Sequence, residues 1–125
     1  MQIKSAKDLI VYRKAYELAM QIFCVSKGFP KEEWYSLTDQ IRRSSRSVCS
    51  NLREAWAKRR YEAHFVNKLT DADGENAETE TWLDFGCDCG YISEADHAQF
   101  IERSHEIGAM LGSIIKDRSS FIQKS

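Results

Sequence analysis

The feature that most limits the fold is the near absence of helix-breaking residues from long periodic stretches. The chain has 125 residues, with a single proline, Pro30, and six glycines. Apolar residues recur every three or four positions through four stretches, which is the repeat of one face of an α-helix. Because each such helix can bury its apolar face only against another, we expect one all-α domain over residues 1–125, an antiparallel up-and-down four-helix bundle.

Capping residues and breakers predict the boundaries of the first two helices. We expect the first helix to begin at Asp8, a favoured N-cap residue, and to end at about Lys27. Gly28 and Pro30 then interrupt the periodicity and indicate a loop. The second helix is expected to begin near Leu37 or the residue after it, and neither glycine nor proline marks its end.

The last two helices are separated by a short glycine-containing segment. The third periodic stretch begins at Phe65 and stops at Gly90. Ser93 and Asp96 have the spacing of a capping box, in which the hydroxyl accepts a hydrogen bond from the first turn and the acidic side chain reaches back. We therefore expect the fourth helix to begin there.

The periodicity also predicts which residues are buried. In the first helix they are Leu9, Tyr12, Tyr16, Ala19, Phe23 and Ser26. In the second they are Leu37, Ile41, Ser45, Val48, Leu52 and either Ala55 or Trp56. In the third they are Phe65, Leu69, Ala72, Asn76, Thr79, Leu83 and Gly86, and in the fourth Ser104, Ile107 and Leu111, with Phe100 or Ile101 and Ile114 or Ile115. Asn76 and Thr79 either form a polar layer that specifies helix pairing or line a central channel of a ring.

Charge is distributed unevenly along the chain. Residues 37–61 carry seven basic and two acidic side chains, whereas residues 62–96 carry one basic and ten acidic ones. The net charge of the whole chain is only −1. Blocks of opposite sign favour internal pairing, an interface between subunits or a basic face that binds a partner.

The basic residues of the second helix are the candidate site for binding nucleic acid or a partner: Arg42, Arg43, Arg46, Arg53, Lys58, Arg59 and Arg60. On a helix with 100° per residue, four of them lie within roughly 40° of one another beside the apolar face: Arg42, Arg46, Arg53 and Arg60. Guanidinium groups in a row can donate paired hydrogen bonds to phosphates, and Trp56 and Tyr61 offer rings for stacking on unpaired bases.

Two other interpretations of these arginines stay open. They can pair with carboxylates of the acidic third helix, in the same chain or in a neighbour, or they can be solvated at the surface. The pI of about 6.3 argues against non-specific binding of nucleic acid, which is typical of strongly basic domains.

Asn51 and Glu54 are polar residues at the edge of the second helix's apolar face. We expect them to form a structural brace, buried and hydrogen-bonded, that sets the register of the helix. The alternatives are a contact with a partner or an enzyme that uses Glu54. One carboxylate without a second acid, a histidine or a set of metal ligands is a weak basis for catalysis, so we expect no enzymatic activity, no cofactor and no small-molecule substrate.

A metal site and a membrane location are also not expected. Cys87 and Cys89 point about 160° apart on a helix, and the cysteine ligands of zinc are usually separated by at least two residues. No apolar run approaches the roughly 18 residues that cross a bilayer. The N-terminal residues lack the apolar core of a signal peptide, so we expect a cytoplasmic protein with reduced cysteines.

Residues 40–55, QIRRSSRSVCSNLREA, resemble the signature of a four-helix-bundle family, the ribosomal-RNA intervening-sequence proteins. The matching positions in this segment are Gln40, Ile41, Arg42, Arg43, Ser47, Ser50, Asn51 and Glu54. FPKEEWYSL (29–37), DLIVYRKAYELA (8–19) and GY (90–91) resemble other family segments, as do Gly74, Glu78, Glu80, Thr81 and Leu83. Cys49 and Ala55 stand where the family usually has proline and glycine, which predicts a longer second helix.

The resemblance implies a helical bundle that assembles as a ring of five, encoded within inserted segments of large-subunit ribosomal RNA genes and without enzymatic activity. A related branch consists of accessory proteins of diversity-generating retroelements, which are thought to engage nucleic acid and a reverse transcriptase. Two hypotheses follow. In the first, a homo-oligomer binds RNA, DNA or a nucleic-acid-handling protein through its basic second helix. In the second, the protein is purely structural, and its basic helix pairs with the acidic third helix.

Overall fold

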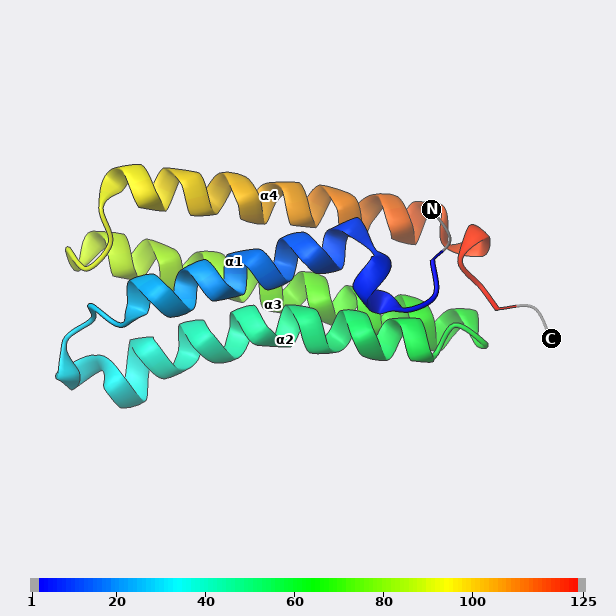
Figure 1. The fold of residues 1–125 in the computed structure, drawn as a ribbon, viewed down its shortest axis with the longest axis horizontal. Coiled ribbons are helices and arrows are strands. Elements are labelled where there is room, and N and C mark those ends of the chain that lie inside the picture. Colours follow the sequence, from blue (N-terminus) through cyan, green and yellow to red (C-terminus); the bar gives the residue numbers. More distant parts are fainter. Residues whose placement is uncertain (1–2, 124–125) are drawn as a thin grey trace.

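The computed structural model describes residues 3–123, which form four helices packed side by side (Figure 1). The helices are α1 (Ile10–Ser26), α2 (Asp39–Ala57), α3 (Glu62–Asp88) and α4 (Glu94–Lys116). Successive helices run in opposite directions, and α2 and α3 share the most extensive contact. The predicted all-α bundle is confirmed. Within the described residues, no helix has both the length and the apolar character needed to cross a membrane.

The predicted N-cap of the first helix, Asp8, is wrong by one residue. The N-cap of α1 is Leu9, and Asp8 instead ends a preceding 3-10 turn, Ala6–Asp8. The Asp8 carboxylate accepts hydrogen bonds from the amides of Lys4 at 2.8 Å and Ser5 at 3.2 Å, and these bonds lower its pKa. The acidic side chain therefore caps the turn that leads into α1, because its oxygens face backward along the chain.

The end of α3 and the start of α4 follow the predicted signals, whereas α2 begins at Asp39 and α3 begins at Glu62, three residues before the predicted Phe65. A π-helical turn, Trp34–Thr38, leads directly into α2. Gly90 has a φ of 81°, in the left-handed region that favours glycine, and it follows α3 as predicted. At the start of α4 the Ser93 hydroxyl accepts a hydrogen bond from the Asp96 amide at 3.1 Å, which confirms that half of the predicted capping box.

The predicted apolar faces of α2 and α3 are confirmed, and that of α4 is confirmed from Phe100 to Leu111, whereas Ile114 and Ile115 are half-buried. All seven residues predicted for α3 are buried, and no other residue of that helix is.

The face predicted for the first helix is half right. Leu9, Ala19 and Ser26 are buried as predicted, but the other buried residues of α1 are Val11, Ala15, Leu18 and Ile22. Tyr16 is 54% exposed, whereas Tyr12 and Phe23 are half-buried at the edge of the core. Two neighbouring faces of α1 have helical spacing. The face with Val11, Ala15, Leu18 and Ile22 packs into the core.

Asn76 and Thr79 form a polar layer inside the bundle. Asn76 is 3% exposed, and its Nδ2 donates to the Ser104 carbonyl of α4 at 2.9 Å. The Thr79 hydroxyl lies 2.8 Å from the Ser44 hydroxyl of α2 and 2.9 Å from the Glu75 carbonyl. These contacts join α3 to both of its neighbours, so the layer pairs helices within one chain.

Gly86 lets the connection between α3 and α4 pack closely on the bundle. A Cβ atom at this position would lie 2.6 Å from Cδ1 of Ile92, closer than non-bonded carbons approach. The amides of Tyr91 and Ile92 both donate to the Gly86 carbonyl, at 2.9 and 3.1 Å. The small residue thus allows the chain to fold back over the end of α3.

Candidate nucleic-acid interface

Three arginines of α2 form a row that faces α1, and we call Arg42, Arg46 and Arg53 the arginine row. The guanidinium carbons of Arg42 and Arg46 lie 4.8 and 5.6 Å from the centre of the Phe23 ring. The guanidinium carbon of Arg53 lies 5.4 Å from the centre of the Tyr12 ring. Each distance is within the range of a cation–π contact, so the rings of α1 support all three guanidinium groups.

The rings that support the arginine row belong to the face of α1 that was predicted to be core. Their role explains why tyrosine and phenylalanine recur there at helical spacing without being fully buried. The Arg42 Nε also donates to the Ser26 hydroxyl at 2.8 Å, and Ser26 is buried. Arg42 is therefore held by two contacts from α1 while its remaining N–H groups stay available.

No carboxylate lies within 4.0 Å of the charged nitrogens of the arginine row in residues 3–123. Guanidinium groups at protein surfaces commonly pair with carboxylates or phosphates, because these anions match their planar fork. Here the three groups have aromatic support and no anionic partner. This arrangement leaves the row able to receive an anion from another molecule.

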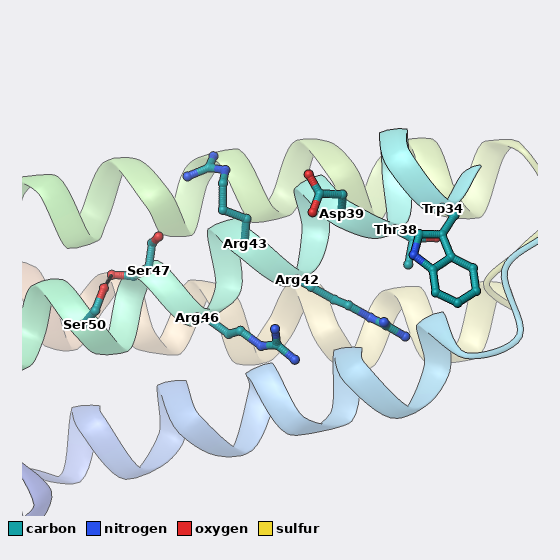
Figure 2. A pocket seen from close by; sticks show the side chains of 8 residues that line it. All are labelled: Trp34, Thr38, Asp39, Arg42, Arg43, Arg46, Ser47 and Ser50. Carbon is teal, nitrogen blue, oxygen red and sulfur yellow. Dashed lines mark hydrogen bonds between the residues drawn. The ribbon is translucent and has the colours of Figure 1, made fainter. Parts of the chain in front are cut away.

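Arg43 shows the opposite arrangement. Its side chain points away from α1 and toward α3, as Figure 2 shows. Nη1 lies 3.1 Å from Oε2 of Glu75, and Nη2 lies 2.7 Å from Oε1 of Glu78. The hydrogen bond that Arg43 donates to Glu78, followed by the charges of both carboxylates, raises the pKa of Arg43. The predicted pairing between the basic and acidic helices is thus present for this residue of the candidate site.

The remaining basic residues follow the end of α2. The helix ends at Ala57, and the Lys58 amide closes its last turn by donating to the carbonyls of Glu54 and Ala55. The prediction that Arg60 continues the row along the helix is therefore wrong, because residues 58–60 form a turn. Lys58 and Arg60 are exposed in this turn, between α2 and α3.

Arg59 and Trp56 form a pair of their own. The Arg59 guanidinium carbon lies 3.5 Å from the centre of the Trp56 ring, and its Nε donates to the Trp56 carbonyl at 2.8 Å. Burial lowers the pKa of Arg59. One face of Trp56 is therefore covered by Arg59, which argues against the predicted stacking of a base there. Tyr61 is 60% exposed and meets His64 edge to face.

Asn51 and Glu54 do not form the predicted buried brace. The Asn51 Nδ2 donates to the Ser47 carbonyl of its own helix at 2.9 Å. The side chain of Glu54 is 54% exposed and lies 2.9 Å from Nζ of Lys68 on α3, which lowers the pKa of Glu54. Asn51 is half-buried and bonds within its own helix, whereas Glu54 is exposed and pairs with a residue of α3. An exposed ion pair of this kind contributes little to stability.

Several carboxylates of α3 are paired with residues outside the arginine row. Asp84 lies 2.7 Å from Nε2 of His97, and Glu80 lies 2.8 Å from Nε2 of His105, both on α4. Together with the pairs of Glu75 and Glu78 to Arg43, these contacts direct four carboxylates of α3 toward α4 or α2.

An exposed tryptophan at the start of α2 belongs to the same surface and was not predicted as a site residue. Trp34 is 60% exposed and lines an open groove of about 510 Å³ together with Arg42 and Arg46 (Figure 2). Helical periodicity does not identify this residue, because it lies in a turn outside the regular helix. A large aromatic residue in a short loop next to a basic helix was the one signal present in the sequence.

Hydrogen bonds to Glu33 hold the turn that carries Trp34. The Glu33 carboxylate accepts from the Ser36 hydroxyl at 2.7 Å, the Leu37 amide at 3.4 Å and the Tyr91 hydroxyl at 3.0 Å. The bonds from Ser36 and Tyr91 lower the pKa of Glu33, and the same contact with Glu33, together with burial, raises the pKa of Tyr91 to about 12. Tyr91 thereby ties this turn to the connection after α3.

Replacing Tyr91→Phe is expected to move the pKa of Glu33 up toward its ordinary value, because one of its hydrogen-bond donors is lost. A carboxyl group with a lowered pKa in the folded state stabilises the fold above its unfolded pKa, and this contribution disappears as the pH falls through the folded pKa. The acid sensitivity of unfolding should therefore decrease in the variant. Titration of the Glu33 carboxyl by NMR checks this, and an unchanged pKa would contradict it.

Comparison with known proteins places the chain in a family. The family model described as 23S rRNA-intervening sequence protein matches residues 7–113. A search of the curated proteins found no match. Among solved structures, a protein with unknown function from the S23 ribosomal protein family of Bacteroides thetaiotaomicron is similar, with 35% identity and a TM-score of 0.78 over 86% of this chain and 96% of that one. The chain therefore belongs to the family of 23S rRNA-intervening sequence proteins.

Proposed function

We propose that the protein binds RNA through the arginine row and that this binding, without catalysis, is its biochemical role. The observation that carries the proposal is that three guanidinium groups on one face are held by aromatic rings and have no carboxylate partner. Phosphate oxygens accept paired hydrogen bonds from guanidinium groups and supply the charge that the row lacks. Lys58 and Arg60, exposed beyond the end of α2, extend the basic surface.

The name of the family supports RNA as the nucleic acid, because it refers to 23S ribosomal RNA. The near-neutral pI fits a local basic face better than a protein that is basic all round. RNA binding by such a face should depend on a few arginines at defined positions and not on the net charge of the protein. The cytoplasm, where ribosomal RNA is found, is the proposed location.

The alternative, a purely structural role for the basic helix, is supported by the contact of Arg43 with Glu75 and Glu78. In that contact the Arg43 side chain points toward α3, whereas the side chains of Arg42 and Arg46 point toward α1, although all three line the same groove (Figure 2). The contact explains how α2 and α3 are held together, and it leaves the other three arginines without a role. We therefore assign Arg43 to helix pairing and the arginine row to binding.

We also propose that the protein self-associates, as the resemblance to ring-forming bundles implies. Several large apolar side chains support this proposal because they are open to solvent, including Ile10 at 63% and Phe85 at 54% exposure. A ring of five is the expected assembly. Size-exclusion chromatography with light scattering measures the mass, and a monomer at all concentrations would contradict the proposal.

Titration of the protein against a pool of structured RNAs at increasing salt tests the proposed function. If three arginines each neutralise one phosphate, log K should fall against log salt with a slope of roughly −2 to −3. Binding should be strongest at low salt, where counterion release is most favourable. The absence of binding at low salt would refute the proposal.

A further inference from the structure

The groove beside the arginine row has an aromatic end and a basic end. Trp34 lies in the turn that leads into α2, and the side chains of Arg42 and Arg46 extend from α2 on the same side (Figure 2). We propose that this groove binds one unpaired nucleotide of an RNA strand, with the base stacked on the Trp34 indole and the phosphates on either side of it on Arg42 and Arg46. This inference rests on the proposed function and narrows its ligand to RNA with unpaired residues.

The exposure of Trp34 is the first observation behind the proposal. Trp34 is 60% exposed although Leu37 and Thr38, at the end of the same turn, are buried. The turn that carries it is fixed by the hydrogen bonds of Glu33 to Ser36, Leu37 and Tyr91. A large ring on an anchored turn presents a stacking surface that loses little conformational entropy when a ligand binds.

The size and lining of the groove are the second observation. Its volume of about 510 Å³ is within the roughly 300–1,000 Å³ of typical small-ligand sites. The groove is open along one side, so a strand can enter and leave it. Its polar lining includes the hydroxyl groups of Ser47 and Ser50 and the carboxylate of Asp39. The carboxylate can accept a hydrogen bond from an amino or imino group on the edge of a base.

Trp34 at one end of the groove and the arginines at the other together favour RNA with unpaired bases over duplex RNA. Stacking on an aromatic side chain requires a base whose face is free, which excludes bases inside a regular duplex. The arginines alone would bind duplex and single strand alike, since both present phosphates. Trp34 should therefore contribute to the binding of unpaired RNA and not to the binding of a duplex.

The test compares Trp34→Ala with Tyr35→Ala, a matched control in the same turn. Tyr35 is 91% exposed and does not line the groove. Fluorescence anisotropy measures the affinity of each variant for a short single-stranded RNA and for the corresponding duplex. We expect Trp34→Ala to weaken single-strand binding by roughly 5- to 100-fold, the range of one base–aromatic stack, and to leave duplex binding unchanged. Trp34→Phe should recover most of the loss.

The dependence on salt separates this inference from the proposed function. Stacking releases no counterions, so Trp34→Ala should weaken binding by the same factor at every salt concentration and keep the slope of log K against log salt. If Trp34→Ala weakens single-strand binding no more than Tyr35→Ala does, the inference is overturned and the role of the arginine row stands. If the unmodified protein binds neither RNA, both fail together.

Discussion

Replacing both Arg46→Glu and Arg53→Glu is expected to weaken RNA binding by at least about 100-fold, because two charge-assisted contacts of about 1.5–3 kcal/mol each are lost and replaced by repulsion. The slope of log K against log salt should decrease in magnitude by about 1.5 to 2, since two phosphates are no longer neutralised. Both side chains are exposed and lie outside the core, so the helical content should not change.

A charge-matched control is available on other parts of the bundle. Arg13 and Arg118 are exposed and pair with Asp8 and Glu62. The double change Arg13→Glu and Arg118→Glu alters the net charge by the same amount and should leave most of the affinity. If both double variants weaken binding equally, binding depends on net charge, and the assignment of the arginine row as the RNA-binding site is contradicted. If the arginine-row variant instead loses its oligomeric state, the row belongs to a subunit interface.

Replacing Asn76→Asp is expected to destabilise the folded protein by about 3–5 kcal/mol at neutral pH. The two side chains have nearly the same shape, so packing changes little. However, the Asn76 Nδ2 donates to the Ser104 carbonyl in a site that is 3% exposed. The substitution replaces this donor with a carboxylate oxygen, which faces another acceptor and carries an uncompensated charge away from water.

The destabilisation at this position should depend on pH in a defined direction. Burial raises the pKa of the introduced carboxyl above the value of about 3.9 that it has in the unfolded chain. The penalty is therefore absent below that value and grows as the pH rises toward the folded pKa. Urea unfolding at about pH 4 and at neutral pH measures the difference.

The same substitution at Asn51 provides the control for Asn76→Asp. Asn51 is half-buried and bonds only within its own helix, so Asn51→Asp should cost less than about 1 kcal/mol. Equal effects at the two positions, or an effect at Asn76 without dependence on pH, would contradict the role assigned to the polar layer.

The faces of α3 and α4 could be predicted because each has one continuous row of buried residues. In α3 even Asn76 and Thr79 belong to this row, since periodicity records position and not polarity. In α1 two neighbouring rows have the same spacing, and the row with the larger residues was predicted to be buried. The structure buries Val11, Ala15, Leu18 and Ile22 instead, and the rings of Tyr12 and Phe23 contact the arginine row at the edge of the core.

The candidate site could be predicted only in part, for a similar reason. Helical angles placed Arg42, Arg46 and Arg53 on one side of α2, and this depends only on sequence spacing. Arg43 lies one position away, yet it pairs with Glu75 and Glu78. The choice between a free and a paired guanidinium depends on which helix lies opposite, and no residue of α2 encodes that neighbour.

The sequence by itself determined the all-helical class, the buried faces of three helices and the family, because periodicity, capping and local motifs are properties of neighbouring residues. Only the tertiary structure decided that the rings of α1 support the arginine row, that Arg60 leaves it and that Trp34 lies at its end. The first of these facts depends on packing between helices that are distant along the chain, and the other two depend on where α2 begins and ends. Packing between helices determines which side chains are exposed and which charged groups are paired. The spacing of residues within one helix does not show which helix packs against it.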